Sequence, residues 1–420
     1  MTDLEKKDVM VNERILNLVR QLLKDNINNC KISVESASKL GENWLGLLNS
    51  LTIEYENIDK NKIKLYLVAK VAPHQTAYRD ALQIREVYIR EIFFYNSVIP
   101  EFRKLQEERR LPQIFNPFPK LYATTTEEFR EGVLMADMKK KGFRVYNHRV
   151  NTDYPHTLMA IKELGKFHAL SYALKAHKPE AFKYLLLNCE ESFFKGLHDS
   201  LVSIVTKLGN IVLKAYDQVE DKEHYDALRN SINGVSNTLK FVFSLKNHEE
   251  YAVINHGDYE VRNILYKYED STQPTVPTEL CMLDWQLSRA GSPALDILMF
   301  IFVCTDKEFR DRHYLDLIHE YYHSFSSLLG QLGCNPDSFL PFSVLLDHLK
   351  QFAPYGLYMA IWVNSLNMKQ SHDIPDVYNS STMDAVIEEM CSTSNDEYIK
   401  KIHDVVAEFI KYGYNFKIAI

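Results

Sequence analysis

Apolar and polar residues alternate in two early stretches of the chain. The segments ISVESASKLGENWLGLLNSLTIEYE and NKIKLYLVAKVA, within residues 32–72, show the period of two that predicts half-buried strands. Farther along, YRDALQIREVYIREIFFYNSVIP carries apolar residues at helical spacing, and we expect this helix to stop at Pro100. Another strand is predicted from Gly132 to Met138, where the chain should pass from one lobe to another.

The later part of the chain has mostly helical periodicity. HTLMAIKELGKFHALSYALKAHKPEAF predicts a long helix with one broad apolar face, and the stretch that ends at Ile420 is almost entirely helical in pattern. Between them, strands over 264–268 and 279–283 flank the turn-rich segment EDSTQPTVPT, which predicts a hairpin. We therefore expect an α+β chain of two lobes. A β-rich N-terminal lobe would span residues 1–136, and a larger, mainly helical C-terminal lobe would span residues 137–420.

Three polar residues flank the predicted hairpin. Asn263 precedes its first strand, Asp284 follows its second, and Asp258 lies one short loop earlier. An antiparallel hairpin places the start of one strand beside the end of the other, so these side chains should converge. His256, Asp258 and Asn263 also have the spacing of the kinase catalytic loop, and Asp284 follows an apolar strand as the D-F-G aspartate does.

This set of residues predicts a phosphotransferase site with a protein-kinase-like fold. We expect Asp258 to be the general base, and Asn263 and Asp284 to bind magnesium. Asp and Asn are also common in turns, where their side chains bond nearby backbone, but a turn does not explain the complete set. His256 and Asp296 are expected to support the catalytic loop without taking part in the chemistry.

The predicted N-terminal lobe contains candidate nucleotide-binding residues. Lys70 ends the run LYLVAK, as the phosphate-binding lysine of V-A-I-K does. Glu91 is our candidate to pair with Lys70, and Glu86 is the rival. A loop that begins at Gly41 could cover the phosphates, although an ordinary hairpin turn is the better explanation of its glycines taken alone.

Backbone groups between Met135 and Met138, including those of Asp137, could bond an adenine edge. Any edge strand would offer the same groups. The aromatic stretch QFAPYGLYMAIWVN could line an acceptor pocket, but such a stripe is more often part of the core. The sequence therefore leaves both the adenine contacts and the acceptor pocket open.

Composition narrows the possible partners and the compartment. The 420 residues carry a net charge of −7 and no basic stripe, so we expect no nucleic acid partner. The apolar run from Ile297 to Cys304 is too short to span a bilayer, and no signal-peptide core is apparent, so we expect no membrane partner. Six scattered cysteines predict reduced thiols in a cytoplasmic protein, and nothing demands more than a monomer.

The chain resembles the ecdysteroid kinase-like family, also called CHK kinase-like, whose relatives include choline and aminoglycoside kinases. HGDYEVRNILY and MLDWQLSRAGSPALDI carry the resemblance most specifically. It implies a bilobal fold, ATP with Mg2+, and phosphorylation of a hydroxyl on an ecdysteroid, a foreign compound or a related small molecule. The family often has other residues where Tyr259, Glu260, Arg262 and Trp285 stand, which affects the expected acceptor more than the chemistry.

Two other functions are compatible with parts of the sequence. A catalytically silent nucleotide- or steroid-binding module could use the same fold, but Lys70, Asp258, Asn263 and Asp284 are all present. A protein kinase is the third possibility. Gly257 in place of arginine and Gln286 in place of the D-F-G glycine argue against it.

Overall fold

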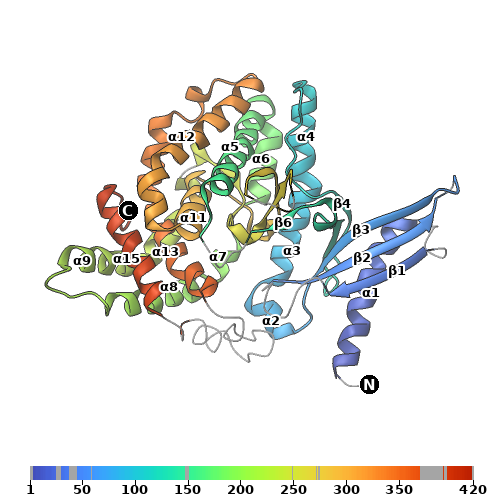
Figure 1. The fold of residues 1–420 in the computed structure, drawn as a ribbon, viewed down its shortest axis with the longest axis horizontal. Coiled ribbons are helices and arrows are strands. Elements are labelled where there is room, and N and C mark those ends of the chain that lie inside the picture. The colour runs from blue at the N-terminus through green and yellow to red at the C-terminus, as the bar shows by residue number, and fades with distance from the viewer. Residues whose placement is uncertain are drawn as a thin grey trace.

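The chain folds into two lobes, a small one built on a sheet and a larger helical one (Figure 1). The computed structural model describes residues 3–24, 30–36, 45–57, 59–146, 151–247, 249–270, 272, 275–368, 391 and 395–418, with the side chains of 3–12 and 247 left out. This is the α+β kinase-like architecture expected from the sequence. None of the described helices is long and apolar enough to cross a membrane.

The small lobe is a five-stranded antiparallel sheet with a helix on one face. Its strands lie in the order β1-β2-β3-β5-β4. The elements are α1 (Asp3–Leu23), β1 (Cys30–Ser36), β2 (Leu47–Glu56), β3 (Lys62–Val71), β4 (Leu121–Thr125) and β5 (Gly132–Ala136). Ile15, Leu18 and Val19 of α1 pack on Leu67 and Val71 of β3, which makes a core separate from that of the large lobe.

A broken helix connects the sheet to the large lobe. It consists of α2 (Thr76–Ala81), α3 (Ile84–Phe93), the π-helical turn η2 (Phe94–Val98) and α4 (Ile99–Glu108). The expectation that the helix stops at Pro100 is wrong. Pro100 lies in the first turn of α4, directly after the π-helical turn η2, which changes the hydrogen-bond pattern where the helix meets a residue without an N–H.

The large lobe is mostly helical. After η3 (Lys139–Lys141) and β6 (Arg144–Val145), its first helices are α5 (Tyr154–His177), α6 (Pro179–Asn188), α7 (Phe193–Gly196), α8 (His198–Leu213), α9 (Lys222–Asn233) and α10 (Val235–Val242), followed by the short turns η4 (Leu245–Asn247) and η5 (Glu249–Tyr251). Its last helices are α11 (Ala294–Cys304), α12 (Lys307–Gln331), α13 (Phe342–Asn367) and α15 (Asp396–Lys411), with η8 (Pro336–Ser338) before α13.

Two small sheets in the large lobe hold the segments that matter for the site. β7 (Val253–Asn255) pairs with β10 (Arg289–Gly291), and β6 pairs with β8 (Ile264–Tyr268), which pairs with β9 (Pro277–Met282). The turns η6 (Val261–Asn263) and η7 (Trp285–Leu287) stand just before β8 and just after β9. The hairpin predicted from the sequence is thus present as β8 and β9.

Aromatic stacking joins the connecting helix to the large lobe. The ring of Phe94 in η2 lies flat on Trp285, with 3.7 Å between centroids and 5° between planes. Phe118 and Phe167 surround the pair, and α3 contributes Val87 to the same core. The connecting helix therefore packs with the large lobe as well as beside the sheet (Figure 1). The lobe boundary after residue 136 stays a prediction.

Candidate active site

Strand alternation decides the direction of Lys70. In β3, Leu67, Ala69 and Val71 face α1, so Val68 and Lys70 face the other side of the sheet. On that side, Val68 packs in a cluster with Ile92 of α3. Lys70 also extends toward α3, and its side chain is only 6% exposed. A lysine so deeply buried needs anionic partners.

Lys70 forms two ion pairs. Its Nζ lies 2.9 Å from Oε2 of Glu91 and 2.8 Å from Oδ1 of Asp284. Glu91 is fully buried on the inner side of α3, whereas the rival Glu86 is exposed on that helix. Burial by itself lowers the pKa of Lys70, but the carboxylates of Asp284 and Glu91 raise it above its usual value. The ammonium group therefore stays charged and ties β3 to the segment after β9.

The catalytic loop, residues 256–263, brings Asp258 and Asn263 together. Nδ2 of Asn263 donates to the backbone oxygen of Asp258 and to its Oδ2, both at 2.9 Å. Burial and the nearby Glu260 carboxylate raise the pKa of Asp258 to about 7, although Arg262 and the Asn263 hydrogen bond lower it. A carboxylate with this pKa can both accept and release a proton near neutral pH.

Asp296 holds the start of the catalytic loop. From the first turn of α11, its Oδ2 accepts the N–H of His256 at 2.7 Å and its Oδ1 accepts the N–H of Gly257 at 3.0 Å. His168 Nε2 lies 3.3 Å from the same carboxylate. These contacts fix the backbone of the two residues that precede Asp258, and the supporting role of Asp296 stays a prediction.

His256 connects the catalytic loop to the hairpin. Its Nε2 donates to the backbone oxygen of Leu283 at 2.9 Å, and burial lowers its pKa, so the ring is neutral. The backbone N–H of Leu283 in turn donates to the backbone oxygen of Asn263 at 2.9 Å. Asp284 follows Leu283 directly, so this network places Asn263 and Asp284 at the same end of the hairpin, as the sequence predicts.

The oxygen atoms at this end suit a magnesium ion. The amide of Asn263 and the carboxylate of Asp284 are hard oxygen donors, which Mg2+ prefers. Within the described part of the chain, no group of three or more His, Cys, Asp and Glu side chains could hold a metal. Because Mg2+ is commonly held by one or two protein oxygens together with substrate phosphates, two donors are enough here.

A model of the ecdysteroid kinase-like family matches residues 40–334. The chain belongs to this family. Membership supports a small-molecule kinase, and it agrees with the resemblance inferred from the catalytic-loop and hairpin motifs. No curated protein matches the chain.

Several solved structures resemble this ecdysteroid kinase-like chain. A Plasmodium vivax ethanolamine kinase is 14% identical, with 89% of this chain and 86% of that chain covered and a TM-score of 0.41. A spectinomycin phosphotransferase in complex with ADP and spectinomycin is 12% identical, with 93% and 98% covered and a TM-score of 0.40. A glucosamine kinase is 9% identical, with 82% and 89% covered and a TM-score of 0.34. At these TM-scores, the likeness to solved structures carries no further conclusion.

The expected nucleotide contacts are only partly described in this family member. Gly41 lies outside the described residues, so its role stays a prediction. Met135 lies within β5, paired with Val68 and Leu121 on either side. The N–H of Asp137 donates to the Tyr66 oxygen at 3.0 Å, and its side chain accepts from the N–H groups of residues 139 and 140. Met135, Asp137 and Met138 therefore stay predicted adenine contacts, although the backbone oxygen of Met138 already accepts the N–H groups of Lys141 and Phe143 at 3.0 and 3.1 Å.

Charged residues beside the base were missed as functional candidates. The carboxylate of Glu260 is 1% exposed and accepts from Nε of Arg262. Farther along, Nη1 of Arg289 donates to the Gly257 oxygen at 2.9 Å from a fully buried position. The sequence shows Glu260 and Arg262 as departures from the usual family motif, which is the signal that could have pointed to them. No sequence signal pointed to Arg289.

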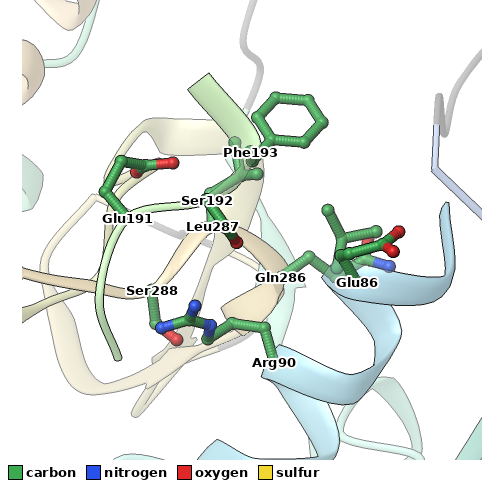
Figure 2. A pocket seen from close by; sticks show the side chains of 9 residues that line it. Glu86, Arg90, Glu191, Ser192, Phe193, Gln286, Leu287 and Ser288 are labelled. Atoms are coloured by element: carbon green, nitrogen blue, oxygen red, sulfur yellow. The ribbon is translucent and has the colours of Figure 1, made fainter. Parts of the chain in front are cut away.

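A water-sized cavity lies between α3 and the segment after Asp284 (Figure 2). Its lining includes Arg90, Gln286 and Ser288. Nη1 of Arg90, both amide atoms of Gln286 and Oγ of Ser288 are buried and lack hydrogen-bond partners within the described part of the chain. The volume of about 10 Å³ suits one water molecule, which could bridge these groups.

Proposed function

We propose that the chain is an ATP-dependent kinase that transfers the γ-phosphoryl group to a hydroxyl of a small-molecule alcohol. The observation that carries the proposal is the convergence of two clusters on one hairpin end. Nζ of Lys70 lies 2.8 Å from Asp284 and 2.9 Å from Glu91 there, and Asn263 at the same end bonds Asp258. This is the set of groups that phosphoryl transfer requires.

In the proposed reaction, Asp258 orients the acceptor hydroxyl and receives its proton. The hydroxyl oxygen forms a bond to the γ-phosphorus, the bond from that phosphorus to the β–γ bridging oxygen breaks, and ADP leaves. Protein side chains contribute mainly by positioning and by neutralising charge, because the transition state is loose. Asp258 is half-buried with a pKa raised to about 7, which suits transfer of one proton near neutral pH.

Other residues would hold the nucleotide and its cation. Lys70 is proposed to bind the phosphates, with Glu91 fixing its position. Gly41 is proposed to contact the phosphates, and backbone groups of Met135, Asp137 and Met138 are proposed to contact the adenine. Asn263 and Asp284 are proposed to bind Mg2+, which would neutralise phosphate charge. Lys70 contacts Asp284, so the proposed phosphate-binding lysine and the proposed cation-binding carboxylate lie side by side.

The acceptor is proposed to be an ecdysteroid or a similar small molecule. Family membership supports this class, and the departures at Glu260 and Arg262 border the base. We further propose that the protein acts as a cytoplasmic monomer, in keeping with its acidic composition and scattered cysteines.

The test compares the wild type with Asp258→Asn. Purified protein with Mg-ATP is offered ecdysteroids, choline, aminoglycosides and phenolic glycosides, and phosphorylated product is detected by mass spectrometry. Asp258→Asn should lose activity by about 10² to 10⁴, the usual range for a general base, while Mg-ATP affinity stays within a few-fold. Asp284→Asn should instead weaken Mg-ATP binding.

Asp316→Asn on the exposed side of α12 is the matched control, and it should behave like the wild type. Near-normal turnover in Asp258→Asn would show that the base is assigned wrongly. Absence of Mg-ATP binding in the wild type would contradict the kinase proposal as a whole.

A further inference from the structure

A second, larger cavity lies behind the catalytic loop. Its volume is about 330 Å³, at the small end of the range for ligand sites in proteins. It is bounded by Val261 of the catalytic loop and by parts of four helices of the large lobe. Those helices contribute Cys304 at the end of α11, Lys307 at the start of α12, Asn364 near the end of α13, and Lys401 on α15. We call this space the polar cavity.

Two amide groups in the lining present unused oxygen atoms. Asn364 is 1% exposed, and its Nδ2 donates to the Ala360 oxygen one helical turn earlier at 2.9 Å. Asn367 lies at the end of the same helix and places Nδ2 3.5 Å from Oε2 of Glu260. Neither Oδ1 atom has a hydrogen-bond partner among the described residues. A buried oxygen without a partner destabilises a fold, so a ligand that donates hydrogen bonds would relieve that cost.

Lys401 contributes a donor to the same space. Its Nζ donates to Oδ1 of Asn151 and to the Val303 oxygen, both at 3.0 Å. An ammonium group carries three N–H bonds, and these two oxygens take two of them. Asn151 also lines the cavity and donates to Oδ2 of Asp306 at 3.1 Å. The lining therefore offers one cationic donor beside two amide acceptors.

The charges in the lining cancel. Three carboxylates and three ammonium groups line the polar cavity: Asp306, Glu397, Asp404, Lys307, Lys400 and Lys401. Some already pair locally, as Lys400 does with Asp404 at 2.7 Å. No aromatic side chain is among the described residues of the lining, so the cavity lacks the cage that quaternary ammonium groups prefer. These features disfavour both cationic ligands and anionic ligands.

A hydroxyl group matches what the lining offers. It can donate to an amide oxygen and accept from an ammonium group at once, and it carries no charge. The polar cavity also adjoins the catalytic loop, because Val261 lines it and Asn367 contacts Glu260 next to the proposed base. We propose that the polar cavity binds a neutral, hydroxyl-rich small molecule. This ligand is the phosphoryl acceptor if the kinase function proposed above holds.

Two sources could supply such a ligand, a sugar-like polyol or the hydroxyl-bearing part of a polyhydroxylated steroid. The test is isothermal titration of the full chain without nucleotide, using myo-inositol, methyl β-glucoside, 20-hydroxyecdysone and choline as probes. We expect at least one hydroxyl-rich probe to bind and choline not to bind. Binding of the steroid alone or of a sugar-like probe alone identifies the source.

Asn364→Leu tests the location of the site. Leucine has a similar size but no amide oxygen, so probe affinity should fall at least tenfold while the melting temperature stays equal or rises. Asn188→Leu is the matched control, because Nδ2 of Asn188 makes the same bond to the oxygen one turn earlier, that of Tyr184 at 2.8 Å, on α6. If Asn364→Leu does not fold, Lys401→Met provides the same test of affinity.

Three results would overturn the proposal: unchanged probe affinity in a folded Asn364→Leu variant, binding of choline, or binding of none of the hydroxyl-rich probes. Mg-ATP binding is measured separately on the wild type. A chain that binds a polyol in the cavity but no Mg-ATP would keep this inference and contradict the kinase function. A chain that binds Mg-ATP but none of the hydroxyl-rich probes would contradict this inference and keep the kinase function.

Discussion

At the scale of the residue, the surroundings of Asp258 decide how its proton moves. Burial and the Glu260 carboxylate raise its pKa to about 7, and Arg262 opposes them. The proposed base must be ionised to accept a proton, so kcat/KM for the acceptor should rise with pH through about 7. The measurement is kcat/KM between pH 5 and 9, since this ratio reports the free enzyme.

Glu260→Gln should move this acid limb to lower pH, because it removes the negative charge that raises the pKa of Asp258. Glu269→Gln, an exposed change near the hairpin turn, is the control and should leave the profile in place. An acid limb that does not move in Glu260→Gln would show that another group sets it.

The same pKa predicts how stability depends on pH. A carboxyl group with a folded pKa of about 7, above its ordinary 3.8, binds its proton more tightly in the folded state. That contribution is complete below about pH 4 and is lost as the pH rises through 7. Asp258→Asn should therefore be more stable than the wild type at pH 8, by at most roughly 4 kcal/mol. The advantage should shrink toward pH 4. Urea unfolding at pH 8 and pH 5 measures both values, and an equal difference at the two would contradict the assignment.

Gly257 is required by its backbone and by its neighbours. Its φ is +87°, and a Cβ atom there would lie 1.8 Å from the Leu287 oxygen. Gly257→Ala should therefore destabilise the fold by at least about 2 kcal/mol in urea unfolding. Gly330→Ala in α12 is the control, because a Cβ there meets nothing within 4 Å among the described residues. It should stabilise by roughly 0.5–1 kcal/mol, as alanine does in helices.

At the scale of the element, the sequence predicted the hairpin and its flanking polar residues well. Period-two alternation and a turn-rich linker are local signals, so β8 and β9 could be found without knowledge of their neighbours. The course of the helix through Pro100 could not be predicted, because a π-helical turn does not change the apolar pattern of the sequence. The hydrogen-bond partners of buried charged residues could not be predicted either. The contact of Arg289 with the Gly257 oxygen depends on how separate elements pack.

The first turn of α11 positions the catalytic loop through one carboxylate. Asp296 accepts N–H bonds from His256 and Gly257, and Asn could accept at only one of these oxygens. Asp296→Asn should cost about 1–3 kcal/mol of stability and lower kcat more than it changes the KM for ATP. Thermal unfolding and steady-state kinetics test both effects.

Asp153→Asn is the matched control, since Asp153 is the N-cap of α5 and Asn is an equally good cap. It should change neither stability nor kcat appreciably. If Asp296→Asn behaved the same way, the carboxylate would not be what holds the loop.

At the scale of the whole molecule, the ion pairs of Lys70 join segments far apart in the chain. β3 supplies the lysine, α3 supplies Glu91, and the segment after β9 supplies Asp284. The motifs predicted each residue, but only the packed lobes bring the three into contact. The site is thus a property of how the sheet, the connecting helix and the large lobe fit together.

A double-mutant cycle of Lys70→Met, Glu91→Gln and the double variant tests this coupling. Lys70→Met should destabilise the fold by about 3–5 kcal/mol, because it leaves the fully buried Glu91 carboxylate without its cation. Lys70→Met with Glu91→Gln should recover much of that loss, since glutamine is neutral and can still accept the backbone N–H of Trp285, which lies 3.4 Å from Glu91. Turnover should stay low in both variants, because the phosphate-binding lysine is absent. Urea unfolding and the product assay separate the two effects.

The exposed pair of Lys64 and Glu54, 2.7 Å apart on the sheet, is the control for this cycle. Lys64→Met should change stability little, because water solvates the glutamate left behind. If Lys70→Met cost no more than Lys64→Met, Glu91 would be neutral in the fold. The lobes would then be held by packing such as that of Phe94 on Trp285, with no contribution from charge. If the double variant regained stability but not turnover, the buried pair of Lys70 and Glu91 would be needed for activity but not for folding.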